Sequence, residues 1–427
     1  MKEIFVRPLI KHKMKRLEER HEPDMNGLFN VEQFISDKIT GRKDSLLKND
    51  LQTNHNQLRE AIEGRSVLVV GGAGTIGSSY IKAMLPFKPG KLVVVDINEN
   101  GLTELVRDCR SRSDIELPKD FKSYPVNFGD RVFDKIFRKE GPFHIVANFA
   151  AHKHVRSEKD IFSIEAMIEN NVIRAKRFLD QLLNTPPQHF FCVSTDKAAN
   201  PVNIMGASKK LMEEVILAYA DDIKITTARF ANVAFSNGSL LAGFIERMMK
   251  QQPLSCPADV KRYFVSPRES GEICLLACML GSSGEIFFPK LRPEKDLIPF
   301  KGIAINFLEA TGFDVYECAS ENEAREKAVA FKGKKYPVYF FESDTSGEKL
   351  YEEFYTDEET LDLDRFVSLG VVSNAPRRSK KELNKVISVL ENLFSKDIAK
   401  EDIVRTLNEL LPTFQHVETG LNLDQKM

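Results

Sequence analysis

The sequence lacks several features that would place the protein in a specialised class. It contains no tryptophan, and its six cysteines are scattered along the chain: Cys109, Cys192, Cys256, Cys274, Cys278 and Cys318. Cys274 and Cys278 are one helical turn apart, but no second pair and no nearby histidine completes a zinc-binding pattern. Reduced cysteines in an intracellular protein are therefore the simplest interpretation.

Long apolar runs and a strong net charge are also missing. The apolar runs are far shorter than the roughly 20 residues that a membrane helix needs, and the first segment, "MKEIFVRPLIKHKMKRLEER", is too charged for a signal peptide. A net charge of −1 gives no general attraction to nucleic acid or to a membrane surface. We expect a soluble, cytoplasmic protein with no membrane span and no nucleic-acid partner.

The composition is that of an ordinary globular protein of two or three domains. The chain has 427 residues, of which 42% are apolar and 29% charged. Residues 1–63 are polar and rich in helix-forming residues, which predicts an N-terminal helical extension. This extension either packs on a partner subunit or is a solvated lead-in to the first domain.

From Ser66 onward, short apolar runs alternate with helical patterns. The predicted strands are "SVLVV", "KLVVVD", "HIVANFAA", "HFFCVS" and "KITTARFANV", and amphipathic segments separate them. Such alternation indicates a parallel sheet with right-handed crossovers. Residues 64–231 are therefore predicted to form a doubly wound α/β domain of the Rossmann type.

The alternation weakens after residue 231. Residues 232–362 are predicted to form a smaller substrate-binding region, with a βα-like insertion at about 301–340 around "GFDVYECASENEAREKAVAF". Residues 363–427 are charged and mostly helical in pattern, which predicts a C-terminal helical tail.

A glycine-rich turn follows the first predicted strand. Gly71, Gly74 and Gly77 lie in "GGAGTIG", directly before a helical segment. Glycines let the chain turn sharply and approach a pyrophosphate, which the helix N-terminus then faces. The second strand ends at Asp96, whose carboxylate can bind both ribose hydroxyls and repel a 2′-phosphate, so the pattern favours NAD over NADP. A tight turn without a ligand is the alternative.

A second polar cluster follows the predicted strand that ends at Val193. Thr195, Asp196 and Lys197 lie in "STDKAANPVNIMGASKK", at a strand end where ligands and catalytic groups collect in open α/β sheets. Met205 and Lys209 are four residues apart and share one face of the next helix. Asp196 and Lys197 suit general acid and base catalysis if burial tunes them toward neutrality. A solvated turn is the alternative.

The stretch "NFAAHKHV" ends another predicted strand of the sheet. The small residues Ala150 and Ala151 would let a cofactor lie close over the sheet, and Lys153 and His154 would point into the cleft. An ordinary hydrogen-bonded histidine is the alternative for His154.

Together these motifs resemble a known family. The chain is similar to the extended short-chain dehydrogenase/reductases, and more closely to the bacterial nucleotide-sugar 4,6-dehydratases that act on UDP-N-acetylglucosamine. The matching motifs are "GGAGTIG", "AAHKHV", "STDKAANPVNIMGASK", "RFANVAFSNGS", "KRYF" and "GEKLYEEF", in order from about residue 66 to 360.

The resemblance implies a chemistry for the polar cluster. In the family, a hydride leaves C4 of the sugar for NAD, water is lost across C5 and C6, and the hydride returns to C6. The resemblance implies that Lys197 takes the C5 proton and Asp196 protonates the departing C6 hydroxyl. Thr195 would hydrogen-bond near the C4 oxygen, and Lys209 would hold the nicotinamide ribose.

Met205 occupies the place of the tyrosine that removes the C4 hydroxyl proton in most short-chain dehydrogenases. Methionine cannot titrate. At this position the chain resembles the branch of dehydratases that carries methionine and retains configuration at C5. The resemblance then makes Asp196 the base for the C4 hydroxyl, acting through Thr195, and implies C5 retention.

The resemblance implies further binding residues. On the cofactor side they are Gly71, Gly74, Thr75, Ile76, Gly77, Asp96, Asn98, Asn127, Ala150, Ala151, Lys153 and Lys209. On the side of the UDP-sugar they are His154, Asn232, Ser239, Arg262 and Glu348. The family usually reads "RPGEK" where this chain reads "TSGEK", so Thr345 replaces an arginine and leaves this sugar contact open.

Two alternatives stay open beside the dehydratase. A nucleotide-sugar epimerase on the same fold would not need the pair of Asp196 and Lys197. A catalytically silent NAD-binding scaffold would account for Met205 and the missing arginine. The resemblance also implies a homo-oligomer, a dimer or larger.

Overall fold

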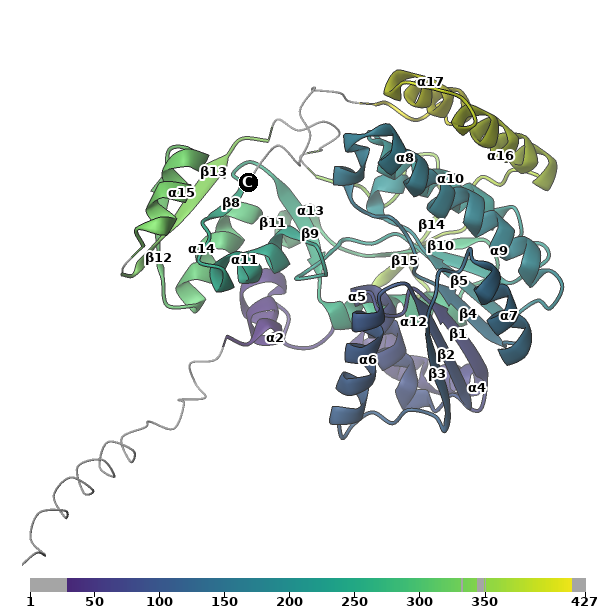
Figure 1. The fold of residues 1–427 in the computed structure, drawn as a ribbon. Helices are drawn as coiled ribbons and strands as arrows, with labels where there is room; N and C mark the ends of the chain where they lie inside the picture. Colours follow the sequence, from purple (N-terminus) through teal and green to yellow (C-terminus); the bar gives the residue numbers. More distant parts are fainter. Residues whose placement is uncertain (1–28, 332, 344–348, 350, 417–427) are drawn as a thin grey trace, which may run out of the picture.

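The computed structural model describes residues 29–331, 333–343, 349 and 351–416 (Figure 1). Within these residues a large α/β lobe lies beside a smaller lobe. The larger lobe is built on a nine-stranded sheet, and the smaller lobe contains two three-stranded sheets.

The central strands of the large sheet are the predicted apolar runs. In spatial order they are β3 (Asp120–Pro125), β2 (Lys91–Asp96), β1 (Ser66–Val70), β4 (Ile145–Asn148), β5 (His189–Val193) and β6 (Ile225–Ala228), all parallel. Residues 67–70 are at most 1% exposed, as expected of a strand covered on both faces. The predicted doubly wound α/β fold is confirmed, and its chain order reverses between β1 and β4.

The sheet extends beyond the range 64–231 that the sequence predicts for it. Strand β10 (Glu285–Pro289) pairs parallel with β6, and β15 (Leu369–Val372) and β14 (Leu361–Asp362) then add antiparallel. A short apolar strand has the same local pattern whichever sheet it joins, so the sequence does not reveal this return. The larger lobe is therefore assembled from distant parts of the chain.

Helices cover both faces of the large sheet. They are α5 (Thr75–Met84), α6 (Glu99–Ser111), α7 (Arg131–Glu140), α8 (Ile161–Ile168), α9 (Arg174–Leu182), α10 (Ile204–Leu217) and α12 (Pro267–Leu280). Helix α12 packs along α5, which begins in the glycine-rich turn. It starts with a capping box of Ser266 and Glu269 and has Pro267 in its first turn. This buried helix supports the half of the large lobe that carries the glycine-rich turn.

The smaller lobe contains two short sheets and three longer helices. One sheet is β7 (Asn232–Val233), β9 (Lys261–Val265) and β11 (Leu297–Pro299); the other is β8 (Leu254–Pro257), β13 (Lys335–Phe341) and β12 (Asp314–Cys318). The helices are α11 (Leu240–Met249), α14 (Phe300–Ala310) and α15 (Glu321–Val329). The predicted βα segment is β12–α15–β13. Because β13 pairs with β8, this segment is built into the lobe.

The described N-terminal segment packs on its own chain. It forms α2 (Val31–Phe34), the π-helical η2 (Ile35–Thr40), α3 (Lys48–Thr53) and α4 (His55–Ile62). Phe34 and Ile39 are buried in the core of the smaller lobe, whereas Leu58 and Ile62 are buried in that of the larger lobe. The segment therefore bridges both lobes, and a purely solvated lead-in does not describe residues 31–62.

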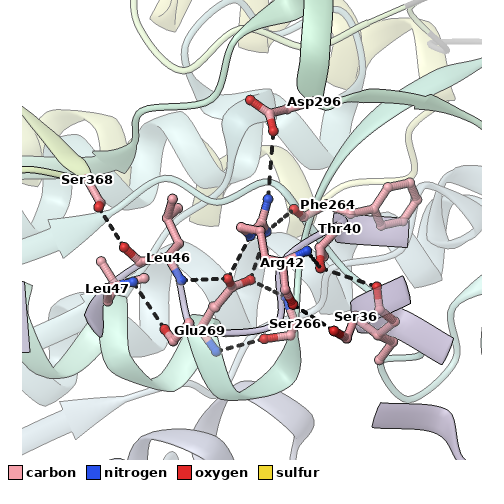
Figure 2. A network of polar contacts seen from close by, with 12 residues as sticks. Ser36, Thr40, Arg42, Leu46, Leu47, Phe264, Ser266, Glu269, Asp296 and Ser368 are labelled. Carbon is pink, nitrogen blue, oxygen red and sulfur yellow. Dashed lines mark hydrogen bonds and ion pairs between the residues drawn. The ribbon is translucent and has the colours of Figure 1, made fainter. Parts of the chain in front are cut away.

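Arg42 is the centre of this bridge, as Figure 2 shows. Its guanidinium donates two hydrogen bonds of 2.8 Å to the Glu269 carboxylate on α12 and one of 3.0 Å to the carbonyl of Phe264 on β9. Asp296 of the smaller lobe lies 3.7 Å away. One planar side chain thus ties the N-terminal segment to both lobes.

The described C-terminal part, up to residue 416, is mostly helical after the strand β15. Helices α16 (Lys380–Phe394) and α17 (Lys400–Leu410) lie beside α10 (Figure 1). Beyond α17, the Gln415 amide donates to the Pro201 carbonyl at 3.1 Å. Among the helices of the described residues, none has the length and apolar character needed to cross a bilayer.

Candidate active site

A cavity of about 800 Å³ lies along the carboxyl ends of the central strands and reaches into the smaller lobe. It lies at the reversal of strand order, where open α/β sheets bind ligands. Most predicted site residues line it: Gly71, Gly74, Thr75, Ile76, Gly77, Asp96, Asn127, Ala150, Ala151, Lys153, His154, Thr195, Lys197, Met205, Lys209, Asn232, Ser239 and Arg262. Asn98 and Asp196 lie outside this lining, and Glu348 lies outside the described residues.

The glycine-rich turn needs glycine for steric reasons. Gly71 has φ +75°, and a Cβ there would lie 2.4 Å from the backbone nitrogen of Ala150. A Cβ on Gly77 would lie 2.3 Å from the Gly71 carbonyl oxygen. Gly74 precedes α5 at its N-cap position and lines the cavity. The turn presents backbone and a helix N-terminus to the cavity, which fits a pyrophosphate.

Asp96 lies at the end of β2, beside this turn. Its carboxylate accepts hydrogen bonds of 2.9 Å from the backbone amides of Ala73 and Asn98. These bonds hold it at the cavity wall, as ribose binding requires. Asn98 instead caps α6, because its side chain accepts from the Gly101 amide at 2.9 Å. Asn98 thus has a structural role as a helix cap, and its contact with the cofactor stays a prediction.

A loop from the smaller lobe reaches across the cavity to the turn. The Asn237 amide donates to the Thr75 hydroxyl at 2.9 Å, and the Lys153 ammonium donates to the Asn237 carbonyl at 3.1 Å. Burial lowers the pKa of Lys153. His154 lies against Gly238, where a Cβ would come within 3.0 Å of its ring. Lys153 and His154 are thus at the predicted strand end and contact this loop.

Thr195, Asp196 and Lys197 form a compact polar group after β5. Asp196 Oδ1 accepts hydrogen bonds from the Thr195 hydroxyl at 2.8 Å, from the Lys197 amide at 2.9 Å and from the Lys197 ammonium at 3.1 Å. Asp196 is only 4% exposed, beneath the two cavity-lining side chains. A proton at the cavity wall can therefore reach Asp196 through either neighbour.

A second carboxylate, which sequence reasoning missed, faces Lys197. Glu352 Oε1 lies 3.4 Å from the ammonium, and its side chain is 4% exposed. Burial alone lowers the pKa of Lys197, but the negative charges of Asp196 and Glu352 outweigh burial, so the net pKa is raised. Glu352 lies in "GEKLYEEF", where adjacent glutamates give no local sign of which one points inward.

Helix α10 places Met205 and Lys209 on the cavity wall. Asn203 caps the helix by accepting from the Gly206 amide at 2.7 Å. The Lys209 ammonium donates to the Val193 carbonyl at 2.7 Å, and burial lowers its pKa. The Met205 amide donates to the buried Glu158 carboxylate at 2.9 Å, a partner that the sequence analysis did not single out.

The smaller lobe adds a cationic and aromatic end to the cavity. Arg262 lines it, and its guanidinium donates to the carbonyls of Lys261 and Lys349 at 2.9 Å. Ser239 caps α11 by accepting from the Ala242 amide at 3.2 Å, so its side chain has a structural partner as well as a place on the wall. Further lining residues absent from the prediction are Phe244, Glu246, Arg247, Phe264, Phe300 and Phe341.

The described residues offer no metal centre. No group of three or more histidine, cysteine, aspartate or glutamate side chains with the geometry to hold a metal ion occurs among them. All six cysteines are buried and unpaired by disulfides.

Comparison with known proteins places the chain in a family. Residues 67–372 match the family described as polysaccharide biosynthesis protein. A Methanocaldococcus jannaschii protein described as an uncharacterized membrane protein is 30% identical over 357 residues, covering 81% of this chain and 96% of that protein.

The names of two further relatives state a pathway or an enzyme activity. The capsular polysaccharide biosynthesis protein CapD of Staphylococcus aureus is 25% identical over 83% of this chain, which spans only 55% of CapD. A UDP-glucose 4-epimerase of Rickettsia conorii is 26% identical over 84% of this chain and 98% of that enzyme.

Solved structures share the fold at low identity. The structure of Pen from Bacillus thuringiensis matches with a TM-score of 0.60 and 20% identity, over 77% of this chain and 98% of that one. A double mutant of the dTDP-glucose 4,6-dehydratase DesIV from Streptomyces venezuelae, solved with NAD, matches with a TM-score of 0.51 and 17% identity over 67% of this chain and 87% of that one. With the family match covering most of the large lobe and the cavity, the chain belongs to the polysaccharide biosynthesis protein family.

Proposed function

We propose that the protein is an NAD-dependent 4,6-dehydratase that converts UDP-N-acetylglucosamine, or a close nucleotide-sugar, to its 4-keto-6-deoxy derivative for glycan biosynthesis. The observation that carries this proposal is the contact of 3.1 Å between the carboxylate of Asp196 and the ammonium of Lys197, at the wall of the cavity. Loss of water from a sugar needs such a paired acid and base.

The residues of the larger lobe fit the cofactor. The glycine-rich turn would face the pyrophosphate, Asp96 the adenosine ribose and Lys209 the nicotinamide ribose. A bound nicotinamide dinucleotide would supply a reversible hydride acceptor for C4 of the sugar. NAD is also the cofactor named in the structure of DesIV, which supports this choice.

The proton-transfer roles follow from the contacts of Asp196. The Thr195 hydroxyl donates to Asp196 Oδ1 at 2.8 Å, so a proton from the C4 hydroxyl would pass through Thr195 to Asp196. Protonated Asp196 would then be the acid for the departing C6 hydroxyl. Its neutralisation removes one of the charges that raise the pKa of Lys197, which brings the amine closer to a usable base for the C5 proton.

Met205 gives no group that can titrate at the cavity, which supports the route through Thr195 and Asp196. We propose retention of configuration at C5, with Lys197 removing the C5 proton and delivering a solvent-exchanged proton to the same face. Arg262 and the aromatic end of the cavity would hold the nucleotide diphosphate, because a guanidinium matches phosphate oxygens in geometry.

Proton NMR of the purified protein with NAD and UDP-N-acetylglucosamine in heavy water tests the proposal. Dehydration would produce a new C6 methyl signal with deuterium at C5, and the configuration at C5 would distinguish retention from inversion. A panel of other nucleotide-sugars, tested in parallel, would detect dehydration if the substrate is not UDP-N-acetylglucosamine.

An epimerase is the second candidate, because the Rickettsia UDP-glucose 4-epimerase aligns over 84% of this chain. In the same experiment an epimerase would give a C4-inverted sugar and no methyl signal. If the dinucleotide binds and no nucleotide-sugar in the panel is converted, the result would favour a catalytically silent NAD-binding scaffold over both enzymes.

A further inference from the structure

Lys197 is held by carboxylates from two distant parts of the chain. Its ammonium lies 3.1 Å from Asp196 Oδ1 and 3.4 Å from Glu352 Oε1. Both carboxylates are 4% exposed, so neither is well solvated. The third charged group facing the ammonium is Arg262 on β9, whose charge opposes that of the two carboxylates.

The position of Glu352 is fixed by contacts independent of Lys197. Fully buried Arg229, after β6, donates to the Phe354 carbonyl at 3.0 Å and to the Glu359 carboxylate at 2.8 Å. Its other nitrogens pair with Glu213 on α10 at 2.9 Å. The segment that carries Glu352 is thus anchored to the same helix as Met205 and Lys209.

This anchoring leaves one lysine between two carboxylates. A buried carboxylate is costly unless a cation or hydrogen-bond donor compensates it. While Asp196 is charged, both carboxylates stabilise the ammonium. Once Asp196 has been protonated, Glu352 is the charged carboxylate left beside Lys197.

We propose that Glu352 is a positioning residue of this active site, whose carboxylate holds the Lys197 ammonium at rest and accepts its proton after Asp196 has become neutral. The inference rests on the proposed function. The N–H bond of Lys197 breaks and an O–H bond forms on Glu352, which converts the ion pair into a neutral amine and a neutral acid.

The protons balance over the reaction. The C4 hydroxyl proton reaches Asp196 and leaves with the C6 oxygen as water. The C5 proton moves to the neutral Lys197 amine, and the resulting ammonium, whose protons exchange with solvent, later delivers a proton to C5. Glu352 then returns its proton to Lys197, which restores the resting pair of ammonium and carboxylate without any further reactant.

Competitive acetylation of the full-length protein tests the holding role without relying on turnover. The extent of Lys197 labelling by acetic anhydride is followed by peptide mass spectrometry from about pH 7 to about pH 11. In Glu352→Gln the labelling midpoint should fall by about one pH unit or more, because one of two nearby negative charges is lost. Glu352→Asp keeps the charge at shorter reach and should shift the midpoint less.

Glu353→Gln is the matched control. Glu353 is adjacent in sequence but half-exposed, and its carboxylate contacts Asn200 and Lys349. Its removal should leave the Lys197 midpoint unchanged. An unchanged midpoint in Glu352→Gln would overturn the holding role, whether or not a nucleotide-sugar is turned over.

A kinetic comparison tests the proton-accepting role. Glu352→Gln should lower kcat by at least about 10-fold and leave KM close to that of the unaltered protein. Equal kcat would overturn this role. If the unaltered protein turns over no nucleotide-sugar, the proposed function and the accepting role fail together, while the labelling midpoint still decides the holding role.

Discussion

The large sheet carries a lysine–carboxylate cluster at each end, and the two differ in their balance of charge. At the amino end of β2 and β3, the buried carboxylate of Glu140 accepts from Lys91 at 2.8 Å, from Lys122 at 2.6 Å and from the Tyr124 hydroxyl at 3.0 Å. At the carboxyl end of β5, one lysine lies between the buried carboxylates of Asp196 and Glu352.

The difference separates a structural cluster from the one that we propose to be reactive. The hydrogen bonds from Lys122 and Lys91 lower the pKa of Glu140 to about 2, so this carboxylate stays charged over the whole neutral range. Lys197 lies between two buried carboxylates, and it lines a cavity. A proton can therefore move within the second cluster, whereas the first can only hold its charges in place.

The largest expected effect comes from breaking the reactive cluster. Lys197→Ala should lower kcat by roughly 10²- to 10⁴-fold, because it removes the proposed base for the C5 proton. The rate of methyl formation by NMR measures the loss. Dinucleotide binding should persist, and a variant that turns over at the full rate would refute the role given to Lys197.

A substitution in the cluster around Glu140 should lower the stability of the protein and leave its turnover unchanged. Glu140→Gln keeps the shape of the side chain but removes the charge that two lysines and a tyrosine share, so the free energy of unfolding should fall by about 1–3 kcal/mol. Urea unfolding measures this change. Turnover per folded molecule should be unaltered, and a selective loss of kcat would erase the distinction between the clusters.

Lowering the pH should remove the contribution of the Glu140 charge to the free energy of unfolding. Its folded pKa of about 2 lies below its usual value, so its stabilisation is present above roughly pH 4.3 and is lost as the pH falls toward 2. The difference in unfolding free energy between the unaltered protein and Glu140→Gln should thus shrink between about pH 6 and about pH 3. A constant difference would point to packing instead of charge.

The smallest effect is expected at Met205. Met205→Leu preserves apolar volume at a buried side chain that cannot itself titrate, so kcat should stay within about threefold. The pH profile of kcat should be superimposable on that of the unaltered protein. A displaced profile would mean that the methionine influences proton transfer, in conflict with the route through Thr195 and Asp196.

The sequence predicts the local features well and the distant contacts poorly. The glycine-rich turn, Asp96 and the group from Thr195 to Lys197 were predictable, because each follows a strongly apolar strand. The resemblance also assigns Asn98 to the cofactor, and an asparagine three residues before Gly101 is at the same time a helix-capping pattern.

Glu352 and the added strands were not predictable in the same way. Glu352 reaches Lys197 only because Arg229 anchors its segment, and that contact joins residues far apart in the chain. Likewise, β10 and β15 have the pattern of any buried strand, and their partners are set by the tertiary fold. Sequence periodicity reports burial, but it does not say against what a residue is buried.

The attachment of the N-terminal segment has a consequence for synthesis on the ribosome. The Asp50 carboxylate accepts hydrogen bonds from the backbone amides of Val367 at 2.6 Å and of Ser368 at 2.8 Å. A segment made early therefore completes its contacts only after residues made much later have emerged. The large lobe cannot complete its sheet during most of translation, so its apolar edge should depend on chaperones until the last strands emerge.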